Sequence, residues 1–350
     1  MGKKIQRQIN TWVAEEHDVR LFMHTTDYEP AVDLLPGEIF FYKGSGRLNQ
    51  ELNRISAARR LLVALEKFRP DIIYLRYGIY VYPLHQLFNI APVVEDVTTN
   101  DLLQHQDLGR FFDFYNRLTR GLLLRHVEGL VSISHELAIS PAFSVFHKPT
   151  AVIANGIDLD AYQPLPAPAN SVPRLVFIGT PTAGFEAHGI DKLVRLAGHC
   201  ADLQIDVIGY DGFRGQSILP TNITFHGYLR EEHYRQLLAA ADVALSSLGF
   251  HRIGLQEASP LKSREYLAYG LPMVVPYRDT DLDDLDLDVF LKIPNREDNV
   301  DSHAQSIRDF AYRMRGRRVD RAIIAPRIDV RLKEQQRLQF FEQVLSNAGK

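Results

Sequence analysis

Cysteine, tryptophan and long apolar runs are scarce in this sequence. Of its 350 residues, one is cysteine, one is tryptophan and four are methionine. A single thiol, Cys200, excludes an intramolecular disulfide framework and a zinc site made of several thiolates, so we expect a reducing compartment and a core position for this residue. The N-terminal residues are basic but no apolar run follows them, so no signal peptide is expected.

An excess of charge of either sign is also missing. Lys and Arg total 40 against 43 Asp and Glu, and the balance is 17 against 17 up to residue 150 and 23 against 26 after it. Neither half has the basic excess of a nucleic-acid-binding protein, so no nucleic-acid partner is expected. The longest stretch without formal charge, 77–94, contains two prolines and several polar residues. Prolines and polar residues do not suit a lipid-facing helix, so we interpret 77–94 as buried loop, helix and strand. We expect a cytoplasmic protein.

The overall composition is that of a folded globular protein. Hydrophobic residues make up 45% and charged residues 24%, with 22 glycines and 18 prolines. This excludes a disordered chain, a collagen and a coiled coil. At about 100–200 residues per domain, the length indicates two domains, each large enough to bury a core.

Short β-rich runs alternate with helix-length amphipathic segments along the whole chain. The alternation predicts βαβ units and parallel sheets, hence an α/β protein with two Rossmann-like, doubly wound domains. The clearest strands are expected at 18–24, 71–75, 92–95, 129–134, 174–179, 203–209, 223–225, 243–247 and 272–276, and the clearest helices at 52–68, 104–125, 190–197, 231–240 and 261–269.

The proline-rich segment 164–173 predicts the domain boundary. We expect an N-terminal domain at 1–163, a C-terminal domain at 174–327 and a final helix at 328–350, which could cap its own domain or cross back to the first. The chain opens with a helix, so the strand that normally precedes the first helix, and lies centrally in a doubly wound sheet, is missing from the expected order. We expect the natural N-terminus to lie further upstream.

The segment 251–276 carries the clearest chemical signal. Ser259 and Pro260 are good N-cap and N1 residues, and Gly270 suits the C-terminal cap, so a helix start is predicted at this point. A helix N-terminus offers free N–H groups and partial positive charge, and Lys262 and Arg264 add two cations at the same end. Together they predict a diphosphate site.

Two carboxylates flank this predicted site. Glu257 lies just before the helix and Glu265 in its second turn, so both could accept hydrogen bonds from sugar hydroxyls on either side of a bound diphosphate. The alternative is that Lys262 and Glu265 form a surface ion pair and that Glu257 is a solvated loop residue.

These residues resemble a known family. Glu257 and Glu265 fit the Glu-x7-Glu motif of retaining glycosyltransferases of the GT-B fold, family 4 type, and 260–272 is similar to the donor-binding helix of that group. The resemblance implies a GT-B fold whose two domains face each other across a cleft. Supporting stretches are 131–137, 152–158, 175–179, 188–193, 225–228 and 240–244.

The resemblance also implies roles for single residues. Glu257 would contact the transferred sugar, Glu265 the nucleotide ribose, and Leu261 and Lys262 the diphosphate. Arg264 and Gly227 are further donor-side candidates, the latter from the stretch 225–228.

The donor site departs from the family pattern at two positions. Thr180 and His188 stand where many relatives have an arginine and a lysine that bind the diphosphate. Arg252, beside His251, could restore the missing positive charge as a catalytic residue, or it could be solvated.

On the acceptor side, the loop that contains Thr98, Thr99 and Asn100 follows a predicted strand and would face the cleft. The alternative for this loop is that Thr99 or Asn100 caps the next helix.

The function implied is a metal-independent hexosyltransferase without a cofactor. It would move a sugar from a nucleotide sugar to a glycan or lipid-linked acceptor, with retention of configuration. The acidic run 278–288 has Asp-x-Asp spacings but no His or Glu nearby, so a solvated loop is expected there and no metal. The alternatives are a nucleotide-sugar epimerase or hydrolase and a non-catalytic relative that binds nucleotide sugars. Lys3, Lys4 and Arg7 could give a peripheral contact with anionic lipid at the inner membrane face.

Overall fold

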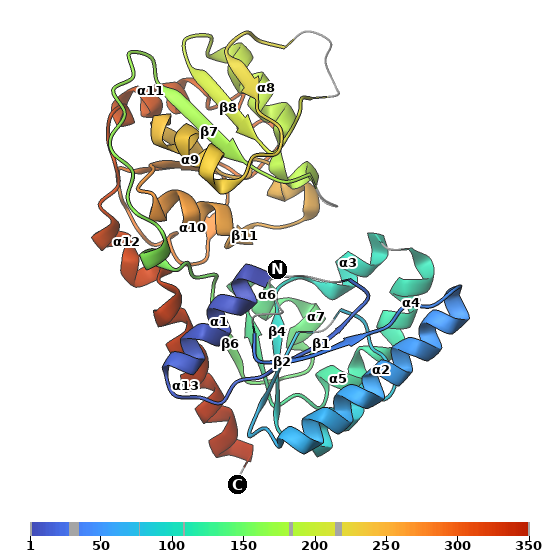
Figure 1. Ribbon diagram of the computed structural model, residues 1–350. Coiled ribbons are helices and arrows are strands. Elements are labelled where there is room, and N and C mark those ends of the chain that lie inside the picture. Colours follow the sequence, from blue (N-terminus) through green and yellow to red (C-terminus); the bar gives the residue numbers. More distant parts are fainter. Residues whose placement is uncertain are drawn as a thin grey trace. The chain divides into compact units, whose positions relative to one another are not determined.

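The computed structural model describes residues 2–27, 35–76, 78–107, 109–181, 185–213 and 219–348 (Figure 1). The chain divides into two compact units. The first consists of Met1–Ala154 together with Val330–Lys350, and the second of Asn155–Asp329. Both contain only parallel strand pairs among the described residues, as the alternating sequence pattern predicts.

The second unit is built on a six-stranded parallel sheet. Its order is β14-β12-β10-β7-β8-β9. When the six strands are numbered by their order in the chain and read from β9, the sheet order is 3-2-1-4-5-6. This is the order of a doubly wound dinucleotide-binding fold. The strands are β7 (Arg174–Ile178), β8 (Gln204–Ile208), β9 (Ile223–Phe225), β10 (Val243–Leu245), β12 (Met273–Val275) and β14 (Phe290–Lys292). A separate parallel pair joins β11 (Glu257–Ala258) to β13 (Arg278–Asp279).

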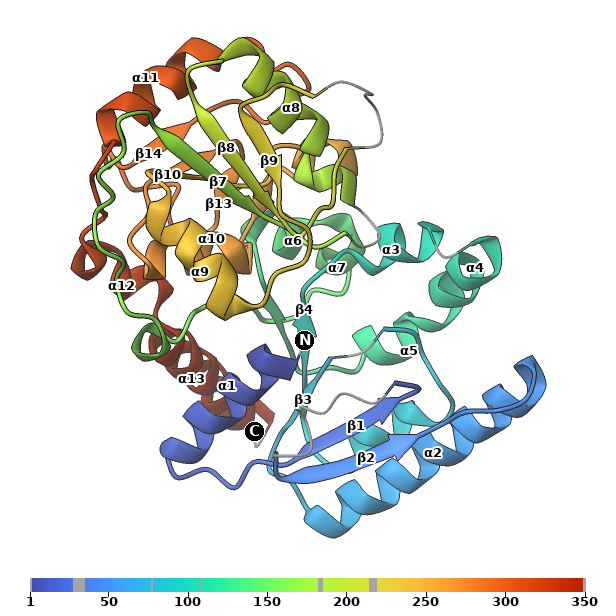
Figure 2. The same cartoon turned by 45° about the horizontal axis from the view of Figure 1, so that its top comes forward.

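Helices cover both faces of this sheet (Figure 2). One face packs on α8 (Ile190–His199) and α11 (Ala304–Met314), and its core includes Cys200, as expected. The other face packs on α9 (Glu231–Ala240), α10 (Leu261–Ala268) and α12 (Arg321–Ile328). The described part of this unit also contains three 3-10 helices, η3 (Leu159–Ala161), η4 (Phe185–His188) and η5 (Phe250–Ile253).

The first unit has two parallel sheets that are not hydrogen-bonded to each other among the described residues. One pairs β1 (Leu21–Thr25) with β2 (Gly37–Phe41), and the other has the order β3-β4-β5-β6, from Ile73–Leu75, Val93–Val97, Gly129–Ser132 and Thr150–Val152. In a doubly wound order, the strand before the first helix would lie between β1 and β3. The break between the two sheets therefore falls where a doubly wound order places its first strand.

Two apolar clusters enclose the strands of this unit. One is formed with α2 (Arg47–Phe68), η2 (Leu84–Asn89) and α5 (Gly121–Leu124), and the other with α1 (Gly2–Ala14) and α13 (Val330–Ala348). The remaining helices are α3 (Asp101–Asp107), α4 (Arg110–Thr119), α6 (His135–Ile139) and α7 (Pro141–Ser144). Phe340 and Phe341 of α13 pack with Trp12, so the final helix crosses back to the first unit.

The residues before the proline-rich segment belong to the second unit rather than to the first. Ile157, Leu159 and Tyr162 are buried in its core, as is Leu165 within the proline-rich segment, and Arg321 donates to the carbonyl oxygen of Leu159 at 3.0 Å. The units therefore part at Asn155, earlier than the proline content indicates, because apolar side chains anchor 157–165 to the sheet that follows. In the described part of the chain, no helix is both long and apolar enough to cross a membrane.

Candidate active site

Three glycines lie at the carboxyl ends of adjacent strands in the second unit. Gly179 follows β7, Gly209 follows β8 and Gly227 lies just beyond β9. A Cβ at position 209 would come within 1.6 Å of the carbonyl oxygen of Gly179, and Gly209 N–H donates to the Gly227 carbonyl at 2.7 Å. Side chains would not fit between these backbones. Ligands of doubly wound folds bind at this edge of the sheet, so the glycines let these backbone segments pack closely at the edge where a ligand is expected.

Helix α10 begins beside the same edge. The Tyr266 hydroxyl accepts a hydrogen bond from Ile178 N–H at 2.7 Å, which ties the helix to the end of β7. The helix starts after Pro260 and has no side-chain cap. Ser259, expected as the cap, instead accepts hydrogen bonds from Asn155 N–H and from Arg264. Among the described residues, the N–H groups of Leu261 and Lys262 have no acceptor and are left for a ligand or for water.

Lys262, in the first turn of α10, carries a buried ammonium. Its Nζ has no hydrogen-bond partner among the described residues, and it lies 4.2 Å from the centroid of the Phe177 ring. Burial lowers the pKa of this lysine to about 7. An ammonium that is removed from water without a counterion is costly, and an anion at the N-terminus of α10 would relieve that cost.

His188 and Thr180 occupy the positions where the family pattern has two cations. His188 shares a hydrogen bond with the Tyr210 hydroxyl at 2.6 Å, and burial together with the nearby Lys262 lowers its pKa to about 3. The imidazole is therefore neutral and is not a substitute for a lysine cation. Thr180 is exposed just after β7. Neither Thr180 nor His188 therefore supplies a second positive charge beside Lys262.

The two acidic residues of the motif lie on different elements. Glu257 is buried on β11, whose partner in register is Arg278 of β13. Glu265 lies on α10, half-buried, and accepts a hydrogen bond from the Tyr234 hydroxyl of α9 at 2.7 Å. The alternative of a surface ion pair between Lys262 and Glu265 is wrong, because the Lys262 ammonium has no hydrogen-bond partner among the described residues. Leu261, at the helix start, is 45% exposed.

Arg264 has a structural role and is not placed for the diphosphate contact that we expected. Its side chain is fully buried, and it donates to both carboxylate oxygens of Asp279 at 2.7 and 2.8 Å. It also donates to the Asn155 carbonyl, the Ser259 hydroxyl and Asp281. Every nitrogen of the guanidinium therefore donates to an acceptor within the protein, and the side chain joins the start of α10 to segments far away in the sequence. Asp279 belongs to the acidic run that we expected to be a solvated loop. Its pairing with Arg264 shows that this expectation is wrong for Asp279.

Arg252 is likewise engaged within the protein rather than held ready for catalysis. It donates to both oxygens of Asp191 at 2.7 Å and, through Nε, to Glu297 at 2.8 Å. Beside it, buried Lys192 binds the carbonyl oxygens of Leu248 and Arg296. These pairs fasten η5 to α8, and so they hold the loop that leads into Glu257.

The acceptor-side candidates lie in the first unit, between β4 and α3. Asn100 Oδ1 accepts from Leu102 N–H at 3.1 Å, so the capping alternative is confirmed for this residue. The Thr99 hydroxyl donates to Gln104 at 2.9 Å, and Thr98 is half-buried. Nearby, burial raises the pKa of Glu95 to about 8, so this carboxyl holds its proton at neutral pH.

Three aromatic residues of the site were not selected from the sequence. Phe177 lies beneath the Lys262 ammonium, Tyr210 binds His188, and Tyr234 binds Glu265. Tyr210 could have been found, because it directly follows the glycine at the end of β8. Phe177 and Tyr234 look like ordinary core residues in the sequence, and only their packing against α10 distinguishes them.

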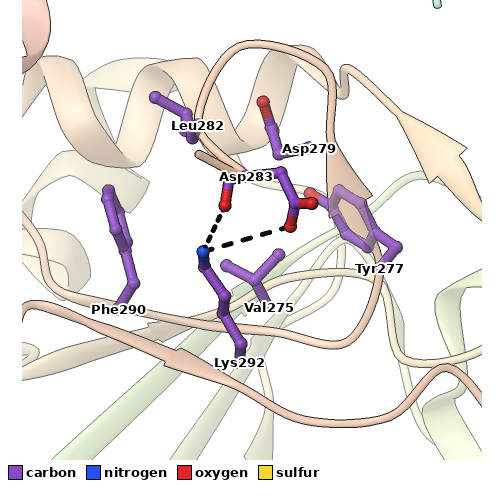
Figure 3. A pocket seen from close by; sticks show the side chains of 7 residues that line it. All are labelled: Val275, Tyr277, Asp279, Leu282, Asp283, Phe290 and Lys292. Carbon is purple, nitrogen blue, oxygen red and sulfur yellow. Dashed lines mark hydrogen bonds and ion pairs between the residues drawn. The ribbon is translucent and has the colours of Figure 1, made fainter. Parts of the chain in front are cut away.

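A small hollow on the second unit is a different feature. It is lined by Val275, Tyr277, Asp279, Leu282, Asp283, Phe290 and Lys292 (Figure 3). Lys292 closes it by donating to the Asp283 carbonyl at 2.6 Å. Its volume of about 10 Å³ is at the lower limit for one water molecule, so no substrate fits. Among the described residues, no group of three His, Cys, Asp or Glu side chains could hold a metal ion.

Comparisons with known proteins give matches among solved structures. No protein-family model and no curated protein matches this chain. Sucrose-phosphate synthase from Thermosynechococcus elongatus is similar at 14% identity and a TM-score of 0.65, over 98% of this chain and 93% of that one. The apo form of the lipopolysaccharide outer core galactosyltransferase WaaB is similar at 11% identity and a TM-score of 0.66, over 99% and 95%.

A third similar structure is that of Anabaena Alr3699/HepE in complex with UDP and glucose. It is 14% identical with a TM-score of 0.59, over 97% of this chain and 95% of that one. These likenesses extend over nearly the whole chain, and they confirm the expected GT-B fold.

Proposed function

We propose that this protein is a glycosyltransferase that moves a sugar from a nucleotide-sugar donor to an acceptor hydroxyl. The observation that carries the proposal is the buried Lys262 ammonium, without a partner among the described residues, at the uncapped start of α10. A diphosphate would satisfy both the ammonium and the free N–H groups. The likeness to a galactosyltransferase and to a structure that contains UDP and glucose supports the same assignment.

The proposed reaction breaks the bond between the anomeric carbon and the diphosphate oxygen while an acceptor hydroxyl bonds to that carbon. Negative charge develops on the leaving diphosphate, where Lys262 and the N-terminus of α10 would stabilise it without a metal ion. The acceptor hydroxyl attacks on the face from which the diphosphate departs, which gives retention, and its proton passes to the leaving phosphate oxygen. Glu257 would bind hydroxyls of the transferred sugar, and Glu265 the ribose.

The acceptor is proposed to be a hydroxyl of a glycan or of a lipid-linked saccharide. Thr98, Thr99 and Asn100 would contribute the acceptor side from the first unit.

Titration of the full chain with UDP, GDP and their sugars tests this proposal. We expect heat of binding with at least one nucleoside diphosphate and, with an acceptor mixture, transfer of the sugar. Release of free sugar without an acceptor would identify a hydrolase, an altered sugar nucleotide would identify an epimerase, and binding without turnover would identify a non-catalytic protein. Each of these outcomes contradicts the proposed transfer, and failure to bind any diphosphate contradicts the site as well.

Glu257→Gln is expected to lower kcat/KM for transfer about 10- to 100-fold, because a neutral amide replaces a charged acceptor of sugar hydroxyl hydrogen bonds. Affinity for the free nucleoside diphosphate should stay unchanged, since that ligand has no transferred sugar. Steady-state kinetics and calorimetry measure the two quantities. Glu232→Gln, an exposed substitution on α9, is the control. Wild-type turnover by the Glu257 variant would remove this residue from the site.

Diphosphate affinity is expected to fall as pH rises through about 7. The free protein loses the Lys262 proton in this range, because burial lowers the pKa of the ammonium to about 7. A bound anion raises that pKa again, so binding above about pH 7 should take up a proton. Calorimetry in two buffers of different ionisation enthalpy measures the uptake. Lys262→Arg, which stays charged, should show none, and equal uptake by both proteins would contradict the assignment.

A further inference from the structure

Helix α4 of the first unit turns its apolar residues outward. Phe111, Phe114 and Leu118 share one face of the helix and are 71%, 66% and 69% exposed. Phe112 is 45% exposed, and Leu122 of α5 extends the same row at 44%. We call these five residues the α4 stripe. Figures 1 and 2 show α3 leading from β4 to α4, which lies away from the β3–β6 strands of this unit.

The inward face of the same helix is polar. Asn116 is fully buried and donates to Asp101 at 2.8 Å, and buried Arg120 donates to both oxygens of Asp101 at 2.7 and 2.8 Å. Arg120 also donates to the Ala142 carbonyl at 2.7 Å. Turning the α4 stripe inward would break these buried, charge-assisted contacts, so its exposure is set by the fold.

The stripe is the centre of a concentration of exposed apolar side chains. With Leu103 of α3, six of the exposed large apolar residues of the described chain fall between positions 103 and 122. Singly exposed apolar residues are ordinary, whereas a contiguous group marks a surface that docks on a protein or on a membrane.

The charge around the stripe distinguishes between these two partners. Arg110, Arg117 and Arg125 are exposed along the segment 109–126, whose one carboxylate is Asp113, paired with Arg117 at 2.8 Å. Phenylalanine and leucine on one side of a helix with arginines beside them are typical of segments that lie in the interface of an anionic bilayer. A protein interface would not require this excess of positive charge.

We propose that the α4 stripe docks this protein on an anionic lipid surface, with Phe111 and Phe114 entering the interface and the arginines contacting lipid phosphates. The inference rests on the first unit alone and does not depend on the proposed function. The proposed lipid contact is on α4, whereas the sequence indicated the N-terminal basic residues. Lys4 is not available for that contact, because its ammonium is buried, which lowers its pKa to about 8.

Sedimentation of the full chain with vesicles of phosphatidylcholine, with and without phosphatidylglycerol, tests the proposal. We expect binding to the anionic vesicles, and Phe111→Ser/Phe114→Ser should weaken it at least about tenfold, since two apolar side chains no longer leave water. The control, Val63→Ser/Ile139→Ser, removes side chains that are 65% and 76% exposed on α2 and α6, and it should bind like the wild type. Circular dichroism melts of both variants verify folding.

Absence of wild-type binding to anionic vesicles would overturn the proposal, and so would equal binding by the stripe variant. Sedimentation velocity without lipid tests whether a second copy of the chain covers the α4 stripe instead. A wild-type dimer that Phe111→Ser/Phe114→Ser converts to a monomer, without vesicle binding, would assign the stripe to a second copy of the chain instead.

Discussion

Replacing Lys262 with methionine is expected to weaken binding of a nucleoside diphosphate about 10- to 100-fold and, at the same time, to raise the melting temperature of the free protein. Affinity falls because the diphosphate loses a charge-assisted partner. Stability rises because the folded protein holds this ammonium away from water, with its pKa lowered from 10.5 to about 7. A buried group that destabilises the free protein and has no hydrogen-bond partner among the described residues is explained by a ligand.

The stability of the wild-type protein should depend on pH through the proton of Lys262. Between about pH 7 and 10.5 the unfolded chain holds a proton on Lys262 that the folded protein has lost, so wild-type stability gains from this group as pH rises through that window. Below about pH 7 Lys262 is protonated in both the folded and the unfolded chain, so the full cost of burying the ammonium is present. Methionine carries no charge at any pH and removes both the cost and the dependence.

Calorimetric melting near neutral pH measures the stabilisation. We expect a gain of at least about 2–4 °C, the shift that one kcal/mol produces in a unit of this size. Lys292→Met is the matched control, because Lys292 is 44% exposed and bonds to backbone carbonyls outside the site. It should leave diphosphate affinity unchanged and give no stabilisation. A Lys262→Met protein with lowered stability and wild-type affinity would show that the ammonium is a structural group.

Arg264→Met is expected to cost about 3–5 kcal/mol of unfolding free energy, which is the cost of breaking a buried ion pair from one side. Asp279 is only 3% exposed and would keep a buried charge without its partner. The Asn155 carbonyl and the Ser259 hydroxyl would lose a donor as well. Because these contacts place the start of α10, donor binding should fall together with stability. Urea unfolding followed by fluorescence measures the loss.

Two comparison variants separate this role from a general effect of removing an arginine. Arg327 pairs with Asp284 at 2.8 Å, but both side chains are substantially exposed, so Arg327→Met should cost about 1 kcal/mol or less. Arg264→Met/Asp279→Leu should regain part of the lost stability, because the unpaired charge is then gone. Equal, small losses for Arg264→Met and Arg327→Met would refute the structural assignment of Arg264.

Much of the fold could be predicted from local patterns. The alternation of β-rich and amphipathic runs predicted parallel α/β units, and the helix at 261–268 was placed by Pro260 before it and Gly270 after it. The domain boundary was less accessible. Proline content marks where a chain is stiff, whereas the boundary depends on which apolar side chains are buried together, and Leu159 and Tyr162 are buried with the sheet that follows them.

The sequence by itself determined the location of the candidate site, because the glycines, the helix start and Glu257 to Glu265 are local features of the chain. Only the tertiary structure decided which cation is paired within the protein and which has no hydrogen-bond partner among the described residues. Lys262 and Arg264 are two positions apart on one helix, and nothing local distinguishes them. Arg264 meets Asp279 and the Asn155 carbonyl, 15 and 109 residues away, whereas Lys262 meets the ring of Phe177. The environment of a buried charge is made by segments distant in sequence, so spacing along the chain could not assign the two roles.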